Sequence, residues 1–141
     1  MCIKTIEEIL SRRTGKKTVL FSGRFSVPHP GHFATISRLA ETFGKVKVVI
    51  LDYPERKTTI EYACLVFNEM FKNNSFDVEI LISPWHFGYI TKEQIEKFRP
   101  FDIYAAGNMQ VLLHIESLGI ETFYVPRAYD YKASLMELEK N

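Results

Sequence analysis

Apolar residues along the chain alternate between a spacing typical of buried strands and one typical of amphipathic helices. Short apolar runs predict five strands, at residues 18–22, 46–51, 78–82, 102–106 and 121–125. Apolar positions three and four residues apart predict helices at residues 3–12, 31–43, 59–72, 91–99, 109–118 and 133–139. Strands and helices therefore alternate along nearly the whole chain.

This alternation is typical of a parallel sheet with helices on both faces. Because connections between parallel strands cross over in a right-handed sense, we expect a Rossmann-like, doubly wound α/β fold with a five-stranded parallel sheet. Residues 1–141 contain no repeat, low-complexity stretch or linker, which predicts a single domain. Stop and capping signals agree with the helix ends: Gly44 follows the second predicted helix, and Thr91 with Gln94 forms a capping-box pattern.

Composition makes nucleic-acid binding the weakest of the candidate functions. The chain has 18 Lys and Arg against 17 Asp and Glu, a net charge of +1, whereas proteins that bind the nucleic-acid backbone usually have a basic excess. Residues 1–17 lack the apolar run of a signal peptide, and no segment approaches the about 18 apolar residues of a membrane helix. The two cysteines, Cys2 and Cys64, form no CxxC motif. We therefore expect a cytoplasmic protein in a reducing compartment.

The loop after the strand at residues 18–22 is the first place to expect chemistry, because ligands of open α/β sheets bind at the carboxyl ends of strands. Residues 22–32 read SGRFSVPHPGH and lead into a helix. Gly23 permits a tight exit from the strand, and Gly31 lets the backbone approach a ligand at the helix N-terminus. The free N–H groups and the dipole of that helix end favour phosphate.

Two histidines, His29 and His32, stand three residues apart in this loop, and both can donate hydrogen bonds to phosphate oxygens. That pattern suits a reaction in which negative charge builds up on phosphorus. If the acceptor is itself a phosphate, its oxygen needs no general base, and catalysis consists of positioning and charge neutralisation. Two other interpretations remain open: ordinary loop or core histidines, and a metal-ligand pair, for which the sequence supplies no third ligand nearby.

The segments 23–25 (GRF) and 29–32 (HPGH) resemble the HxGH signature of the cytidylyltransferase-like nucleotidyltransferases. This superfamily includes glycerol-phosphate and choline-phosphate cytidylyltransferases and the adenylyltransferases for nicotinamide mononucleotide and phosphopantetheine. The resemblance covers most of the chain and implies that His29 and His32 stabilise the transition state. It also implies that several loop residues bind the nucleotide: Ser22, Gly23, Arg24, Phe25 and Gly31.

Two later segments extend this resemblance. Residues 52–57 resemble a loop that carries a substrate-phosphate lysine, which implies a catalytic role for Lys57, although a solvated charge cluster is an equal alternative. Residues 101–107 (FDIYAAG) resemble a strand segment that ends beside the nucleotide base. Gly107 and Asn108 are therefore expected to bind the nucleotide, with helix capping as the alternative role of Asn108.

The last segment departs from the family pattern. Residues 124–127 (YVPR) resemble the YxPR stretch that leads into the family's ISSTxIR motif, which implies that Arg127 binds a phosphate. In place of that motif the chain has residues 131–137 (YKASLME), which lack the closing basic residue but keep Ser134 at a hydroxyl position, so the resemblance implies that Ser134 binds the nucleotide. Two functions therefore remain open: an active enzyme, and a degenerate module that binds a nucleotide without turning it over.

The predicted reaction is transfer of a nucleoside monophosphate from CTP or ATP to a small phosphorylated acceptor, with release of pyrophosphate. The resemblance implies Mg²⁺ carried by the triphosphate and a homodimer. The GRF segment favours ATP, whereas the chain length and the YxPR stretch favour CTP. The aromatic loop at residues 85–89 (WHFGY) lies at the same predicted sheet edge and suits acceptor stacking, packing or a dimer contact; His114, in the middle of a predicted helix, is expected to be structural.

Overall fold

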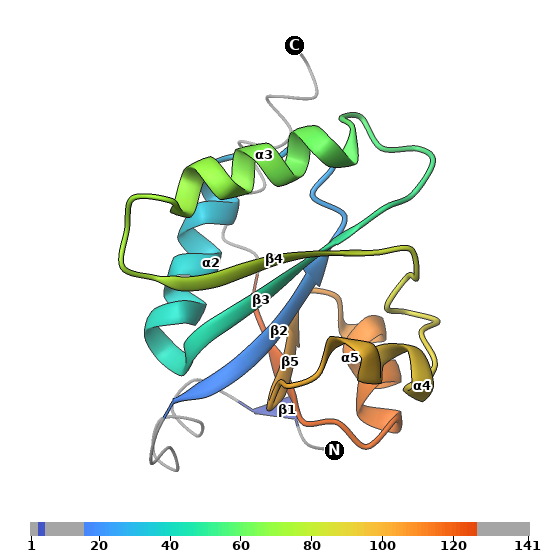
Figure 1. Cartoon of the computed structure of the whole chain (residues 1–141). Helices are drawn as coiled ribbons and strands as arrows, with labels where there is room; N and C mark the ends of the chain where they lie inside the picture. Colours follow the sequence, from blue (N-terminus) through green and yellow to red (C-terminus); the bar gives the residue numbers. More distant parts are fainter. Residues whose placement is uncertain (1–2, 5–15, 127–141) are drawn as a thin grey trace.

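The computed structural model describes residues 3–4 and 16–126, which form one sheet with helices on both faces (Figure 1). The strands of this part of the chain are all parallel to their neighbours. They are β1 (Ile3–Lys4), β2 (Lys17–Gly23), β3 (Gly44–Leu51), β4 (Asp77–Ser83), β5 (Ile103–Ala106) and β6 (Thr122–Tyr124). The helices are α2 (Pro30–Phe43), α3 (Ile60–Phe71), α4 (Lys92–Ile95) and α5 (Met109–Ser117), with a 3-10 turn, η1 (Glu96–Phe98), after α4.

The strand order is β1-β6-β5-β2-β3-β4, so the chain winds in both directions from β2. It runs through α2 and α3 to β3 and β4 on one side, and then returns to β5 and β6 on the other side. The predicted Rossmann-like fold and its five parallel strands are confirmed. The order of strands reverses between β2 and β5, and this is where an open α/β sheet forms its ligand crevice.

Two hydrophobic cores lie on opposite faces of the sheet, because successive strand residues point to opposite faces. Val19 and Phe21 of β2 pack in the core under α2 and α3, which we call the first core. Leu20, between them, packs in the second core with residues of α4, η1 and α5. Figure 1 shows α2 and α3 on one side of the strands and α4 and α5 on the other. Burial on both faces explains why the central strands read as nearly continuous apolar runs.

Several predicted helix ends are confirmed. Gly44 has a φ of 118°, a backbone conformation suited to glycine, and it ends α2. Thr91 and Gln94 form the predicted reciprocal capping box at the start of α4. That helix is shorter than expected, because the chain continues as a 3-10 turn to Phe98.

The helix predicted at residues 3–12 is wrong at its start. Residues Ile3–Lys4 form β1 instead, and they pair with Thr122 and Phe123 of β6. A sheet edge offers unpaired backbone groups to any neighbouring segment, and local apolar spacing carries no information about such a distant partner. The rest of that predicted helix, and the one at residues 133–139, lie outside the described residues.

Among residues 3–4 and 16–126, none of the helices has both the length and the apolar character that a membrane crossing requires.

Candidate functional site

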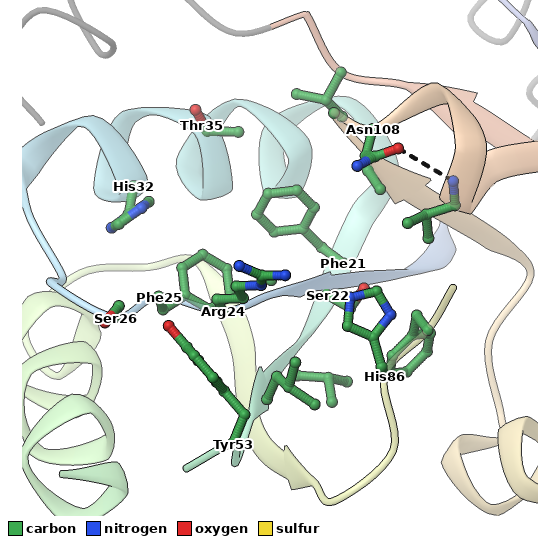
Figure 2. Close-up of a pocket in the computed structure, with 18 of the residues that line it drawn as sticks. Phe21, Ser22, Arg24, Phe25, Ser26, His32, Thr35, Tyr53, His86 and Asn108 are labelled. Carbon is green, nitrogen blue, oxygen red and sulfur yellow. Dashed lines mark hydrogen bonds between the residues drawn. The ribbon is translucent and has the colours of Figure 1, made fainter. Parts of the chain in front are cut away.

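A cavity of about 600 Å³ opens at the carboxyl edge of the sheet, beside the point where the strand order reverses. The ends of β2, β3 and β5, the loops that follow them and the segment after β4 line this cavity. Figure 2 shows His32 and Ser26 on one side of it and His86 and Asn108 on the other. The position agrees with the general rule for ligand sites in open α/β sheets.

Most of the residues expected from the sequence are brought together here. The lining includes Ser22, Gly23, Arg24, Phe25, His32, Lys57, Gly107 and Asn108. His29 and Gly31 lie in the same loop and at the start of α2, but they are not among the described residues that line the cavity. Arg127 and Ser134 lie outside the described part of the chain, so their assigned roles stay predictions.

The two histidines of the loop cap α2 reciprocally. His29 is the N-cap residue, and its Nδ1 accepts a hydrogen bond from the backbone N–H of Gly31 at 3.0 Å. His32 Nδ1 accepts a hydrogen bond from the backbone N–H of His29 at 3.1 Å. The two rings stack with their centroids 4.0 Å apart, and both side chains are buried. The histidine loop is therefore part of the helix start and not a free surface segment.

These hydrogen bonds fix the position of the ring proton. Because Nδ1 of each ring accepts from a backbone N–H, the neutral ring carries its proton on Nε2. Burial lowers the pKa of His29, so that ring is neutral at pH 7. His32 lines the cavity, and this tautomer places a proton on its Nε2.

The shape of the loop depends on close packing between Gly23 and Phe25. The Phe25 ring is buried in the first core and makes edge-to-face contacts with His32 and Phe67, each with centroids 4.9 Å apart. A Cβ atom added to Gly23 would lie 2.9 Å from Phe25 Cζ, closer than side chains tolerate. The backbone of Phe25 has a φ of 45°, which residues other than glycine rarely adopt. Both residues are thus structural supports of His32 as well as lining residues.

One side of the cavity is positively charged. The guanidinium of Arg24 lies 5.4 Å from the centre of the Tyr53 ring, and the Lys57 side chain is exposed at the same cavity. Glu55 is the one acidic residue among the described residues that line it. A cleft with excess positive charge attracts an anionic ligand.

His86 lines the cavity but was not expected as a site residue from the sequence, although the loop at residues 85–89 was expected at this edge. Its Nδ1 accepts from the backbone N–H of Gly88 at 2.9 Å. Burial lowers the pKa of His86, and the nearby charge of Arg24 lowers it further. Tyr53, on which Arg24 lies, was also not expected, because nothing in a loop sequence shows which aromatic residue an arginine will contact.

The opposite side of the cavity is neutral. Tyr104 is fully buried, its ring stacks on Phe87 with centroids 5.4 Å apart, and its hydroxyl shares a hydrogen bond with Ser22 Oγ. Burial raises the pKa of Tyr104, which keeps the hydroxyl protonated. Asn108 Oδ1 accepts from the backbone N–H groups of Gln110 at 2.9 Å and Val111 at 3.3 Å. The capping role of Asn108 at α5 is therefore confirmed.

Trp85 and His114 both have structural roles. Trp85 packs edge-to-face on Phe98, with Lys97 Nζ 5.2 Å from the centre of its ring, so this member of the loop at residues 85–89 has a packing role. His114 Nε2 hydrogen-bonds to the carbonyl oxygen of Ile90, which confirms its expected structural role.

Among the described residues, no group of three or more His, Cys, Asp or Glu side chains is arranged to hold a metal ion. The histidine pair of the α2 start thus acquires no third protein ligand within residues 3–4 and 16–126.

Comparison with known proteins gives a structural similarity alone. No protein-family model matches the chain, and no curated protein matches it. Among solved structures, the chain is similar to the lipopolysaccharide core biosynthesis protein from Thermoplasma volcanium GSS1, with a TM-score of 0.57 and 20% sequence identity. The match covers 81% of this chain and 99% of the other. At this identity the similarity shows a shared fold, in agreement with the topology described above.

Proposed function

We propose that this chain is a nucleotidyltransferase that transfers a nucleoside monophosphate from CTP or ATP to a small phosphorylated acceptor. The observation that carries the proposal is the meeting of His32, Arg24 and Lys57 in one cavity at the carboxyl edge of the sheet. Three donors of this kind around one cavity suit a ligand with several phosphate groups. The similar structure from Thermoplasma volcanium GSS1 is named for lipopolysaccharide core biosynthesis, and a nucleotidyltransferase role is compatible with that name.

The two sides of the cavity suggest how the nucleotide lies. The phosphates bind on the side of Arg24, His32 and Lys57, where the charges are. The base binds on the neutral side, against the segment that contains Asn108. Apolar and aromatic walls with a few hydrogen-bonding groups are typical of sites for such ligands.

The chemical step is an in-line substitution at the α-phosphorus. An oxygen of the acceptor's phosphate forms the new bond to phosphorus, while the bond from phosphorus to the bridging oxygen of the β-phosphate breaks, and pyrophosphate leaves with the electron pair. The attacking oxygen is already anionic and needs no base. His32 donates its Nε2–H to an oxygen of the α-phosphate, and Arg24 and Lys57 balance the charge of the flanking phosphates.

The residues of the cavity fit a magnesium ion that is carried by the substrate. Mg²⁺ commonly binds through one or two carboxylates together with the phosphates of the substrate. Glu55 is the one carboxylate among the described lining residues, so phosphate oxygens would supply most of the ligands. When bound, the ion supplies further neutralisation of the phosphate charge.

The test is calorimetric titration of the protein with CTP and ATP, each with Mg²⁺, followed by measurement of pyrophosphate release with a panel of phosphorylated acceptors. We expect one of the two nucleotides to bind selectively, and pyrophosphate to form with at least one acceptor. The matched control is His32→Asn, because the asparagine Oδ1 can replace Nδ1 as acceptor while the Nε2–H donor is lost. Binding without pyrophosphate release would favour the degenerate nucleotide-binding module, and no binding of either nucleotide would contradict the proposal.

A further inference from the structure

The geometry points to Arg56 as a positioning residue that holds the ligand-binding loop after β2 in its working conformation. The sequence places Arg56 in a charged stretch typical of a solvated surface. In the structure the residue is partly buried, and it is not among the residues that line the cavity. The ligand in this inference is the nucleoside triphosphate of the proposed function, so the inference rests on that function.

The guanidinium of Arg56 joins three separate pieces of backbone through four carbonyl oxygens. Its Nη1 donates to Leu51 at the end of β3, at 2.8 Å, and to Arg24 in the loop after β2. Its Nη2 donates to Phe25 at 2.8 Å. Its Nε donates to Thr58 at 3.0 Å. These bonds direct four of the five N–H donors of the guanidinium to the main chain.

The two residues that follow Arg56 continue the same contact. The backbone N–H of Lys57 donates to Ser26 Oγ at 2.7 Å, and Thr58 Oγ1 donates to the carbonyl oxygen of Ser26 at 2.6 Å. Residues 56–58 thus bind residues 24–26, although 31 or 32 positions separate the partners in these bonds along the chain. We call this set of contacts the loop clamp.

The loop clamp fixes the orientation of two peptide groups in the loop that lines the cavity. Trans peptide groups are planar, so the N–H groups of Phe25 and Ser26 point opposite to the carbonyl groups of Arg24 and Phe25 that Arg56 binds. The strained φ of Phe25, 45°, is held from its carbonyl side in this way. The same restraint sets where the Arg24 side chain leaves the backbone, above the Tyr53 ring in the cavity.

Only an arginine can make this set of contacts from one side chain. A planar guanidinium has five N–H donors in a fixed fork, whereas a lysine ammonium is a single point with three donors. Arg56→Lys therefore keeps the positive charge near the cavity and loses most of the carbonyl contacts. Its effect separates the geometric role of Arg56 from a purely electrostatic one.

The first arm of the experiment needs no ligand. Amide hydrogen exchange is compared in the wild type, Arg56→Lys and Thr58→Val, with Arg99→Lys as the matched control, because Arg99 also donates to a backbone carbonyl, that of Phe101. We expect faster exchange at the amides of Arg56 and Lys57, which donate to the Tyr53 carbonyl oxygen and Ser26 Oγ, in both clamp variants, with β3 and the control unchanged. Unchanged exchange at these residues in both clamp variants would overturn the loop clamp as a restraint. If Arg56→Lys fails to fold, as circular dichroism would show, Thr58→Val decides this arm.

The second arm measures binding of CTP and ATP with Mg²⁺ in a double-mutant cycle with Arg24→Ala. We expect Arg56→Lys to weaken binding on the order of tenfold, the scale of one charge-assisted hydrogen bond. The further loss in the Arg24→Ala background should be clearly smaller, because Arg56 acts partly through Arg24. Independent, additive losses would overturn the positioning role. If the wild type binds neither nucleotide, the proposed function fails, and hydrogen exchange alone still decides whether residues 56–58 restrain the loop.

Discussion

The cavity has two walls that the chain builds in different ways. The charged wall, formed by Arg24, Ser26, His32 and Lys57, consists of the first turn of α2 and of two loops that hydrogen-bond to each other through the loop clamp. The neutral wall consists of Phe87, Tyr104, Gly107, Asn108 and Val111, and it is held by ring stacking and by the cap of α5. One wall depends on backbone hydrogen bonds between loops and the other on packing of regular elements.

Each wall also rests on a different core. Phe25, behind the charged wall, belongs to the first core, whereas Phe87 and Tyr104 of the neutral wall belong to the second core. The sheet separates the two cores, so changes in one wall should have little effect on the packing of the other. We therefore expect loss of a phosphate-binding side chain in the charged wall to affect mainly turnover, whereas substitutions at packing or capping positions of either wall affect mainly stability.

The largest effect is expected from His32→Asn in the charged wall. Loss of a donor to a developing negative charge typically lowers kcat about 100- to 1,000-fold. The asparagine Oδ1 can still accept from the His29 N–H, so the thermal midpoint should remain close to that of the wild type. Pyrophosphate release and calorimetry measure the two effects, and turnover equal to the wild type would remove His32 from the mechanism.

Gly23→Ala should destabilise the packing around Phe25 that supports the charged wall. The new methyl group would meet the Phe25 ring at 2.9 Å, and that ring is held between His32 and Phe67. Overpacking of this kind typically costs about 1–3 kcal/mol of unfolding free energy, which urea denaturation measures. Adding Phe25→Leu should restore part of this loss, and a double variant with no recovery would contradict the proposed clash.

Asn108→Ala should affect the neutral wall through α5. Loss of an N-cap side chain typically lowers the unfolding free energy by about 1 kcal/mol. Asn108→Ser, which keeps a capping oxygen, should recover most of that stability in the same urea experiment. Any loss of nucleotide affinity that remains in Asn108→Ser then measures what the amide itself contributes to binding.

The smallest expected effect is on pH dependence, and it involves His29 in the α2 cap and His86 at the cavity. Burial lowers the pKa values of His29 and His86 below the ordinary 6.5, so the unfolded chain binds protons in a pH range where the folded protein does not. The thermal midpoint should therefore be constant above about pH 7 and fall as the pH drops below about 6.5. Calorimetry from pH 8 to 5.5 measures this, and His29→Asn should reduce the slope. A midpoint that rises as the pH falls would contradict the burial argument.

The fold and the histidine loop could be predicted because their signals are local in the sequence. Apolar runs buried on both faces predict strands, and residues 22–32 carry their glycines and histidines within one connection. The structure then distinguishes the two histidines: His32 lines the cavity, whereas His29 is the N-cap of α2 and does not. This distinction depends on the conformation of the loop, which the sequence does not show.

The residues that sequence reasoning missed depend on distant contacts. Tyr104 reads as one more apolar strand residue, and its hydroxyl meets Ser22 across 82 positions of the chain. Arg56 reads as a surface charge, because a charged stretch does not reveal carbonyl partners in another loop. His86 lay in a loop that was expected at this edge, but only the folded chain shows that its side chain, unlike that of Trp85, lines the cavity.

The reciprocal cap of α2 limits what kind of catalyst its histidines can be. A second proton on either ring would sit on Nδ1, which already accepts a hydrogen bond from a backbone N–H. Protonation of either ring would therefore break a capping hydrogen bond at the first turn of α2. A ring whose Nδ1 must stay unprotonated can donate a hydrogen bond from Nε2, but it cannot take up and release a proton during turnover. A solvent isotope effect on the chemical step should accordingly be close to unity, as in a reaction that moves phosphorus and leaves hydrogen in place.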